Sequence, residues 1–141
     1  MQFTTTLITM TAAFIGLSAA APAPAAALEE RFVPGQCGVH VTQFQKNQNG
    51  VGADYKFEVI IKDAVGAIIG GDSGLVIPDF GSAPVSNEVG GLPNQLVLTV
   101  GSVDADPVQF SYNGATFSSS NGCSTGGYEN GDREMDCGFA C

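Results

Sequence analysis

Alternation of apolar and polar side chains is the feature that most constrains this chain. In residues 55–62, YKFEVIIK, apolar side chains occupy every second position and charged side chains fill most positions between them. This period of two is typical of a β-strand with one buried face. Looser alternation recurs in residues 37–45, 94–103 and 107–112, whereas no window carries apolar residues at helical spacing. Gly and Pro interrupt the chain about every ten residues, so we predict an all-β fold, a single small antiparallel β-sandwich or β-barrel.

Two turn signals place hairpins. Asn113-Gly114 separates PVQFSY from ATFSSS, and Asn-Gly between two β-prone runs is the strongest short-range hairpin signal because both positions require positive φ. A second hairpin is predicted to turn near Asp63 to Gly66. Residues 81–94, GSAPVSNEVGGLPN, are predicted to form a long polar loop between two groups of strands.

The first 31 residues resemble a targeting segment. Residues 7–20 form an apolar run too short to span a membrane, and small residues follow it. We therefore expect a signal peptide over residues 1–20 and a pro-segment or linker over 21–31, with cleavage after Arg31 as one possibility and an attached tail as the other. The secreted β domain then covers residues 32–141.

The charge of that domain restricts its partners. Residues 32–141 contain twelve acidic and four basic side chains, a net charge of −8. Such a surface repels phosphate backbones and anionic membranes. We expect no nucleic-acid partner and no stable membrane insertion.

Four cysteines, Cys37, Cys123, Cys137 and Cys141, lie in the predicted domain. An even count in a small secreted chain predicts two disulfides, for which three pairings exist. We favour Cys37–Cys141 with Cys123–Cys137 nested inside. A zinc site is disfavoured because the chain has no C-x-x-C and one histidine.

Residues 70–74, GGDSG, resemble the segment around the nucleophile of trypsin-like proteases. A nucleophilic Ser73 needs a base, and His40 is the single histidine. A domain of this length provides one barrel where that fold needs two, and Leu75 follows where those enzymes have another glycine. We therefore predict a non-enzymatic protein in which 70–74 is a turn capped by Asp72 and Ser73. Ser73 should be exposed and out of hydrogen-bond reach of His40.

Asp104 and Asp106 are the candidate metal ligands. They lie between two predicted strands, and Asp63, Asp72 and Asp79 lie in other predicted loops. Clustered loop aspartates can bind Ca²⁺, although aspartates are also common in loops because they cap turns. No cofactor is expected, and Ca²⁺ remains a minor alternative.

The C-terminal segment 121–141 is glycine-rich and acidic, and we predict a loop held by its cysteines. Exposed loops on a rigid β scaffold commonly carry binding, and Tyr128, Asp132, Arg133 and Phe139 are the candidate recognition residues. In the alternatives, Phe139 packs in the core between two cysteines and Arg133 pairs with a neighbouring carboxylate. Paired carboxylates around Arg133 could take part in glycosidase chemistry, but the chain has no Trp to line a sugar cleft; they are Glu129, Asp132, Glu134 and Asp136.

The apolar leader, the β-rich body and the ending CGFAC resemble small secreted proteins of filamentous fungi, and more specifically the hypersensitive-response-inducing protein elicitors of plant-pathogenic fungi. The resemblance implies an extracellular effector, present in the host apoplast, that a plant cell-surface receptor or other host protein recognises. It implies plant defence and cell death as the outcome, a role in virulence, and no catalytic residues. The alternatives are a small secreted hydrolase and a Ca²⁺-linked or cell-wall-associated structural protein.

Overall fold

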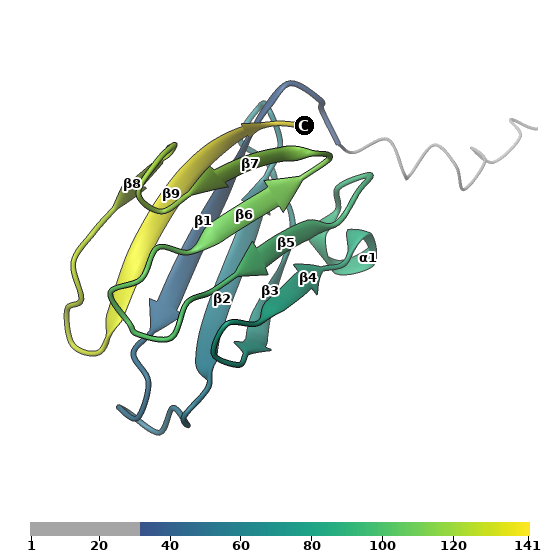
Figure 1. The fold of residues 1–141 in the computed structure, drawn as a ribbon. Helices are drawn as coiled ribbons and strands as arrows, with labels where there is room; N and C mark the ends of the chain where they lie inside the picture. The colour runs from purple at the N-terminus through teal and green to yellow at the C-terminus, as the bar shows by residue number, and fades with distance from the viewer. Residues whose placement is uncertain (1–31) are drawn as a thin grey trace, which may run out of the picture.

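The computed structural model describes residues 32–141, which form two packed antiparallel sheets (Figure 1). The first sheet has the order β3-β2-β1-β9-β8, with β3 (Ile68–Ile77), β2 (Tyr55–Lys62), β1 (Gln36–Phe44), β9 (Asp132–Ala140) and β8 (Cys123–Thr125). The second has the order β4-β5-β6-β7, with β4 (Ser82–Val85), β5 (Leu96–Thr99), β6 (Gln109–Tyr112) and β7 (Ala115–Ser118). The predicted signal peptide and pro-segment lie outside the described residues.

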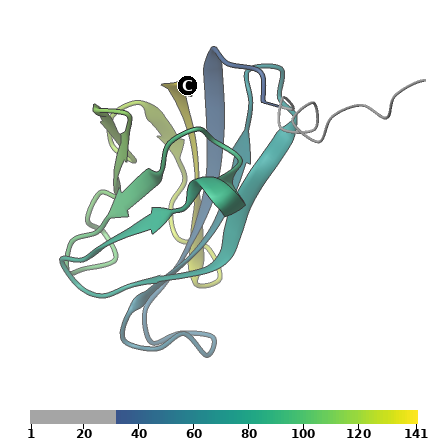
Figure 2. The same ribbon diagram turned by 90° about the vertical axis from the view of Figure 1, so that its right-hand side faces the viewer.

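The two sheets form a β-sandwich and do not close into a barrel. Figure 2 shows them from the side as separate layers, with the short helix α1 (Asn87–Gly90) facing the viewer. The core between the layers comes from alternate positions of the facing strands, among them Val39, Val41, Phe57, Ile61, Leu96, Leu98, Phe110 and Met135. The alternation predicted for 55–62 is observed in β2, whose odd-numbered residues are all buried. The all-β prediction is therefore confirmed in its sandwich form.

Both predicted hairpins are present. Tyr112 pairs with Ala115 across Asn113 and Gly114, whose φ angles are 47° and 82°. The β2–β3 hairpin turns through residues 63–67, where a carboxylate oxygen of Asp63 accepts the N–H groups of Val65 and Ala67. The loop predicted for 81–94 is wrong in part, because this stretch contains β4 and α1. Each of these elements has only four residues, which is too few for a periodic pattern of apolar side chains to be recognised in the sequence.

The disulfides have the pairing that the sequence favoured. Cys37 is bonded to Cys141, and Cys123 is bonded to Cys137. The first bridge joins the start of β1 to the C-terminal residue, and the second joins paired residues of β8 and β9. Two disulfides are typical of proteins that fold in an oxidising, extracellular environment.

The prediction of a C-terminal loop is wrong for residues 123–125, which form β8, and for residues 132–140. Residues 132–140 form β9, a central strand paired with β1 on one side and β8 on the other. Its inner face consists of Arg133, Met135, Cys137 and Phe139, all buried. The apolar alternation begins with an arginine, and this charge obscures the pattern in the sequence.

The GGDSG segment is not a turn, and that prediction is also wrong. It lies in edge strand β3, where an irregularity of register opposite Glu58 accommodates Ser73 and Gly74. A Cβ atom at Gly70 would collide with the carbonyl of Val89 in α1, so this glycine permits close packing of α1 on the strand.

Two expectations for this segment are confirmed. The Asp72 carboxylate accepts the N–H of Gly74 at 2.9 Å. Ser73 is exposed, and no hydrogen bond joins it to His40 in residues 32–141. His40 Nδ1 instead lies 2.8 Å from Asp136 Oδ1, across the β1–β9 pair.

Candidate binding site at the loop end

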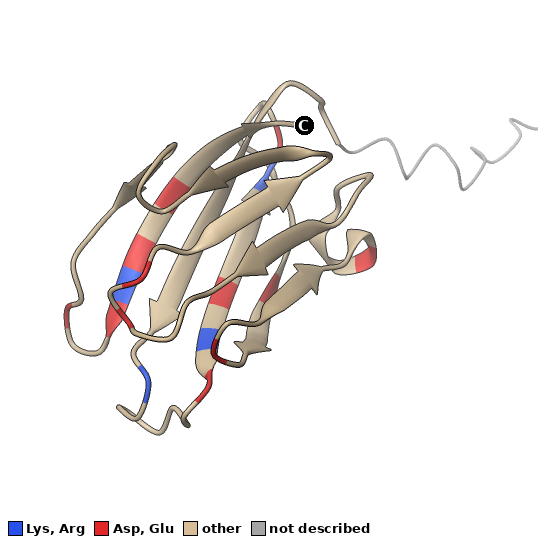
Figure 3. Cartoon of the chain, in the orientation of Figure 1, with Lys and Arg blue, Asp and Glu red and all other residues tan. Residues whose placement is uncertain are grey.

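Four loops meet at the lower end of the sandwich in Figure 1. They are residues 45–54 between β1 and β2, 78–81 between β3 and β4, 100–108 between β5 and β6, and 126–131 between β8 and β9, and we call them together the loop end. The antiparallel topology brings these loops together, because the strands that precede them all run toward this end of the sandwich. These strands are β1, β3, β5 and β8. Each loop carries at least one acidic residue (Figure 3), and Lys46 is their one basic residue.

Lys46 connects three of these loops. Its ammonium group donates to Asp79 Oδ1 at 2.7 Å and to the Ser102 carbonyl at 2.8 Å. It also lies 4.4 Å from the centre of the Tyr55 ring, at the range of a cation–π contact. The hydrogen bond to Asp79 raises the pKa of Lys46 above its ordinary value, and burial opposes that rise. A charged lysine therefore fixes the loops relative to one another.

Arg133 supports the loop end from inside the sandwich. Its Nε donates to Gln43 Oε1 and its Nη2 donates to the Asp106 carbonyl, both at 2.8 Å. The guanidinium lies 5.0 Å from the centre of the Tyr128 ring. Arg133 and Gln43 are both buried, so each needs the hydrogen bond that the other supplies.

Tyr128 and Asp106 fix the loops next to Arg133 through hydrogen bonds. The Tyr128 hydroxyl donates to the Asp104 carbonyl at 2.8 Å, and burial raises the pKa of this phenol. Asp106 Oδ2 accepts the N–H groups of Val103 and Ser102, and these two bonds lower the pKa of that carboxyl group. Loop 100–108 is thus held by its own aspartate as well as by Lys46 and Arg133.

The structure brings four of the sequence-predicted residues together at the loop end. Tyr128, Arg133, Asp104 and Asp106 converge at the loop end. Arg133 is buried and bonded to an amide and a carbonyl, so its prediction as an exposed recognition residue is wrong. The reason is β9, which turns alternate side chains of the predicted loop inward.

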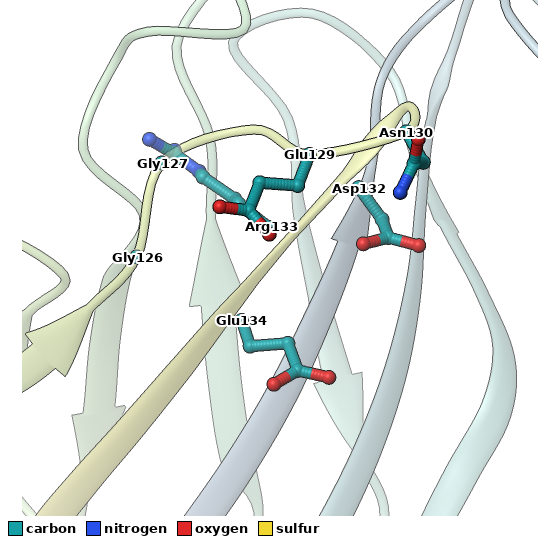
Figure 4. A pocket seen from close by; sticks show the side chains of 7 residues that line it. All are labelled: Gly126, Gly127, Glu129, Asn130, Asp132, Arg133 and Glu134. Carbon is teal, nitrogen blue, oxygen red and sulfur yellow. The ribbon is translucent and has the colours of Figure 1, made fainter.

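Phe139 lies in the core, which also corrects its prediction as a recognition residue. Its ring centre is 5.1 Å from that of Tyr112 and 5.5 Å from that of Phe117. Asp132, by contrast, lies at the start of β9 and lines a hollow of about 360 Å³, together with Gly126, Gly127, Glu129, Asn130, Arg133 and Glu134. Figure 4 shows that Arg133 extends away from the carboxylates of Asp132 and Glu134. The open side of this hollow is therefore acidic.

The geometry does not favour calcium at Asp104 and Asp106. Asp106 is bonded to backbone N–H groups, and Asp104 Oδ1 accepts the N–H of Lys46 at 3.3 Å. Lys46 places a positive charge beside these carboxylates. Within residues 32–141, no three His, Cys, Asp or Glu side chains gather as a group that could hold a metal ion.

Sequence reasoning missed three residues of the loop end. Lys46 was counted only for its charge, and Phe80 and Val103 were not singled out, although both are exposed large apolar residues. The segment PDFG is visible as a turn, but only the structure shows that Phe80 has a positive φ angle, in a position that usually favours Gly or Asn.

The fold and the loop end define a class: a disulfide-linked β-sandwich whose loops are fixed at one end by a partly buried lysine and a buried arginine. No known family model matches this chain, and searches of curated proteins and of solved structures also find no match. In the part of the chain that the structure describes, the single helix has four residues, far too few to cross a bilayer.

Proposed function

We propose that this protein is a secreted elicitor or effector that acts by binding, through the loop end, to a plant cell-surface receptor or another host protein. The observation that carries the proposal is the set of four loops held in one arrangement by Lys46 and Arg133. Loops fixed before binding lose little conformational entropy when a partner docks. A rigid β scaffold that presents such loops is a common design for recognition.

Two further features support this function. The two disulfides fit an extracellular protein. His40 is bonded to Asp136 and makes no hydrogen bond to Ser73 within residues 32–141, so this pair lends no support to a serine hydrolase, in which the base must reach the nucleophile. The resemblance of the leader and the cysteine-rich ending to fungal elicitors points to defence and cell death in a plant as the outcome.

Infiltration of leaves tests the function directly. Purified protein should cause dose-dependent electrolyte leakage and local necrosis, while protein that has been reduced and alkylated should not. A Ser73→Ala variant should be as active as the unmodified protein, because the proposal assigns Ser73 no chemistry. An inactive protein would contradict the elicitor function, and an inactive Ser73→Ala variant that remains folded would favour a hydrolase.

A further inference from the structure

Phe80 is the most exposed large apolar residue in the described part of the chain. Its exposed fraction is 77%, and Val103, on the neighbouring loop, is 54% exposed. The Phe80 N–H donates to the carbonyl of Gly101 at 2.9 Å, which brings the two loops together. The loop end therefore presents two apolar side chains from adjacent turns.

The backbone of Phe80 is also unusual. Its φ angle is 58°, in the left-handed region that bulky residues rarely adopt. The other non-glycine residues with positive φ in residues 32–141 are all asparagines: Asn47, Asn49, Asn113 and Asn130. Asparagine tolerates this region because its short side chain can hydrogen-bond locally. A phenylalanine in such a position, with its side chain in solvent, is not explained by folding and points to function.

The two turns are fixed in place. The Gly81 N–H donates to the Pro78 carbonyl at 2.8 Å, which closes the turn around Phe80. Asp79, the residue before Phe80, is bonded to Lys46, and Lys46 is bonded in turn to Ser102, the residue before Val103. Phe80 and Val103 therefore project from a preorganised surface.

The charge around these residues indicates the partner. Asp79 and Asp104 are adjacent to Phe80 and Val103 in the chain, and Asp54 and Glu129 lie on the two other loops. Lys46 pairs with Asp79, so the carboxylates of the loop end still outnumber its one lysine. An apolar centre with an acidic rim complements an apolar pocket with a basic rim. A second copy of the domain over residues 32–141, with its own charge of −8, would repel that rim, and so would an anionic membrane.

We propose that Phe80 and Val103 are the apolar anchor of a docking surface for a cationic protein, whose own surface offers an apolar pocket bordered by Lys and Arg. The inference rests on the binding function proposed above and names the residues and the partner chemistry. Phe80 enters the pocket, and the acidic residues of the loop end face the basic rim.

An array of short synthetic peptides tests this inference without a known receptor. The probes combine Lys or Arg with Phe, Leu or Trp, and two matched sets replace either the basic residues by Gln or the apolar residues by Ser. The full secreted protein should bind the original set, and each replacement set should bind about tenfold more weakly or worse. Binding should weaken as salt rises from about 50 to 200 mM.

Substitutions locate the surface. Phe80→Asn should lower the affinity about tenfold or more, because it removes a central anchor while keeping a residue that tolerates the same φ. Val65→Asn is the matched control, since Val65 is 71% exposed but lies in the β2–β3 hairpin, away from the loop end. Amide chemical-shift changes on peptide binding should fall in residues 78–81 and 100–108.

Any outcome other than these expected ones overturns the proposal. Equal binding of all three peptide sets, no binding, or an unchanged affinity for Phe80→Asn would contradict it. Self-association or binding to neutral phosphatidylcholine vesicles that is lost in Phe80→Asn would identify a second copy or a membrane as the occupant instead. Leaf infiltration is scored separately, so a protein that binds the peptides but leaves the tissue unchanged refutes the elicitor function and not the docking surface.

Discussion

At the scale of single residues, Phe80 and Asn113 make an informative pair. Both have positive φ, 58° and 47°, but Asn113 is the residue that a hairpin turn favours and Phe80 is not. The fold tolerates Phe80 because the surrounding turn is closed by hydrogen bonds on both sides. The Phe80 ring is exposed and buries little apolar surface. Its packing therefore does not offset the free-energy cost of the left-handed backbone conformation.

This difference predicts opposite effects of two substitutions on stability. Phe80→Asn should raise the free energy of unfolding by about 1 kcal/mol, because it relieves the left-handed conformation. Asn113→Phe should lower it by about 1–2 kcal/mol for the same reason. Urea denaturation followed by circular dichroism measures both. A Phe80→Asn variant that is clearly less stable than the original protein would show that the ring supports the fold, and the argument for a functional role would fail.

At the scale of elements, the edge strand β3 shows what its glycines do. Gly70 lies under α1, and a Cβ atom there would overlap the Val89 carbonyl. Gly74 lies in the irregular part of the same strand, and a Cβ atom there would meet nothing within 4 Å. Two of the three glycines in the GGDSG motif therefore differ: Gly70 is needed for packing, and Gly74 meets no steric requirement.

Alanine at each position separates these roles. Gly70→Ala should lower the free energy of unfolding by about 1–3 kcal/mol, because α1 has to move away from β3. Gly74→Ala should change it by no more than about 0.5 kcal/mol. Thermal unfolding of the two variants side by side gives the comparison. Equal changes in stability for the two variants would mean that α1 can shift without an energetic cost and that its packing does not require Gly70.

Local signals and distant contacts explain which elements the sequence could predict. The hairpin at Asn113-Gly114 and the alternation of β2 depend on neighbouring residues, and both are visible in the sequence. The inner face of β9 begins with Arg133, whose partners are Gln43 and Asp106, residues far away along the chain. The loop end likewise depends on Lys46 meeting Asp79 and Ser102. Such contacts exist only after the sheets have assembled, so composition and periodicity could not reveal them.

At the scale of the whole molecule, the two disulfides close loops of very different length. Cys37–Cys141 spans 104 residues of sequence separation and Cys123–Cys137 spans 14. A cross-link restricts the unfolded chain more when the loop is longer. The first bridge therefore limits the entire domain, and the second limits only the turn from β8 to β9.

Removal of one bridge at a time should show this difference. Replacing Cys37 and Cys141 by Ala should cost about 4–5 kcal/mol of unfolding free energy, and replacing Cys123 and Cys137 should cost about 3 kcal/mol. Guanidinium denaturation of the two double variants under non-reducing conditions measures both losses. The reverse order would show that native packing around the β8–β9 bridge, and not loop length, decides its contribution.

The position of β9 between β1 and β8 has a consequence for how the protein is made. Among the described residues, the last strand, β9, pairs with the first, β1, so the five-stranded sheet lacks an inner strand until β9 has been synthesised. Synthesis proceeds from the N-terminus, so the edge of β1 that pairs with β9 stays unpaired while about one hundred further residues are added. The five-stranded sheet can therefore be completed only after β9 has been synthesised.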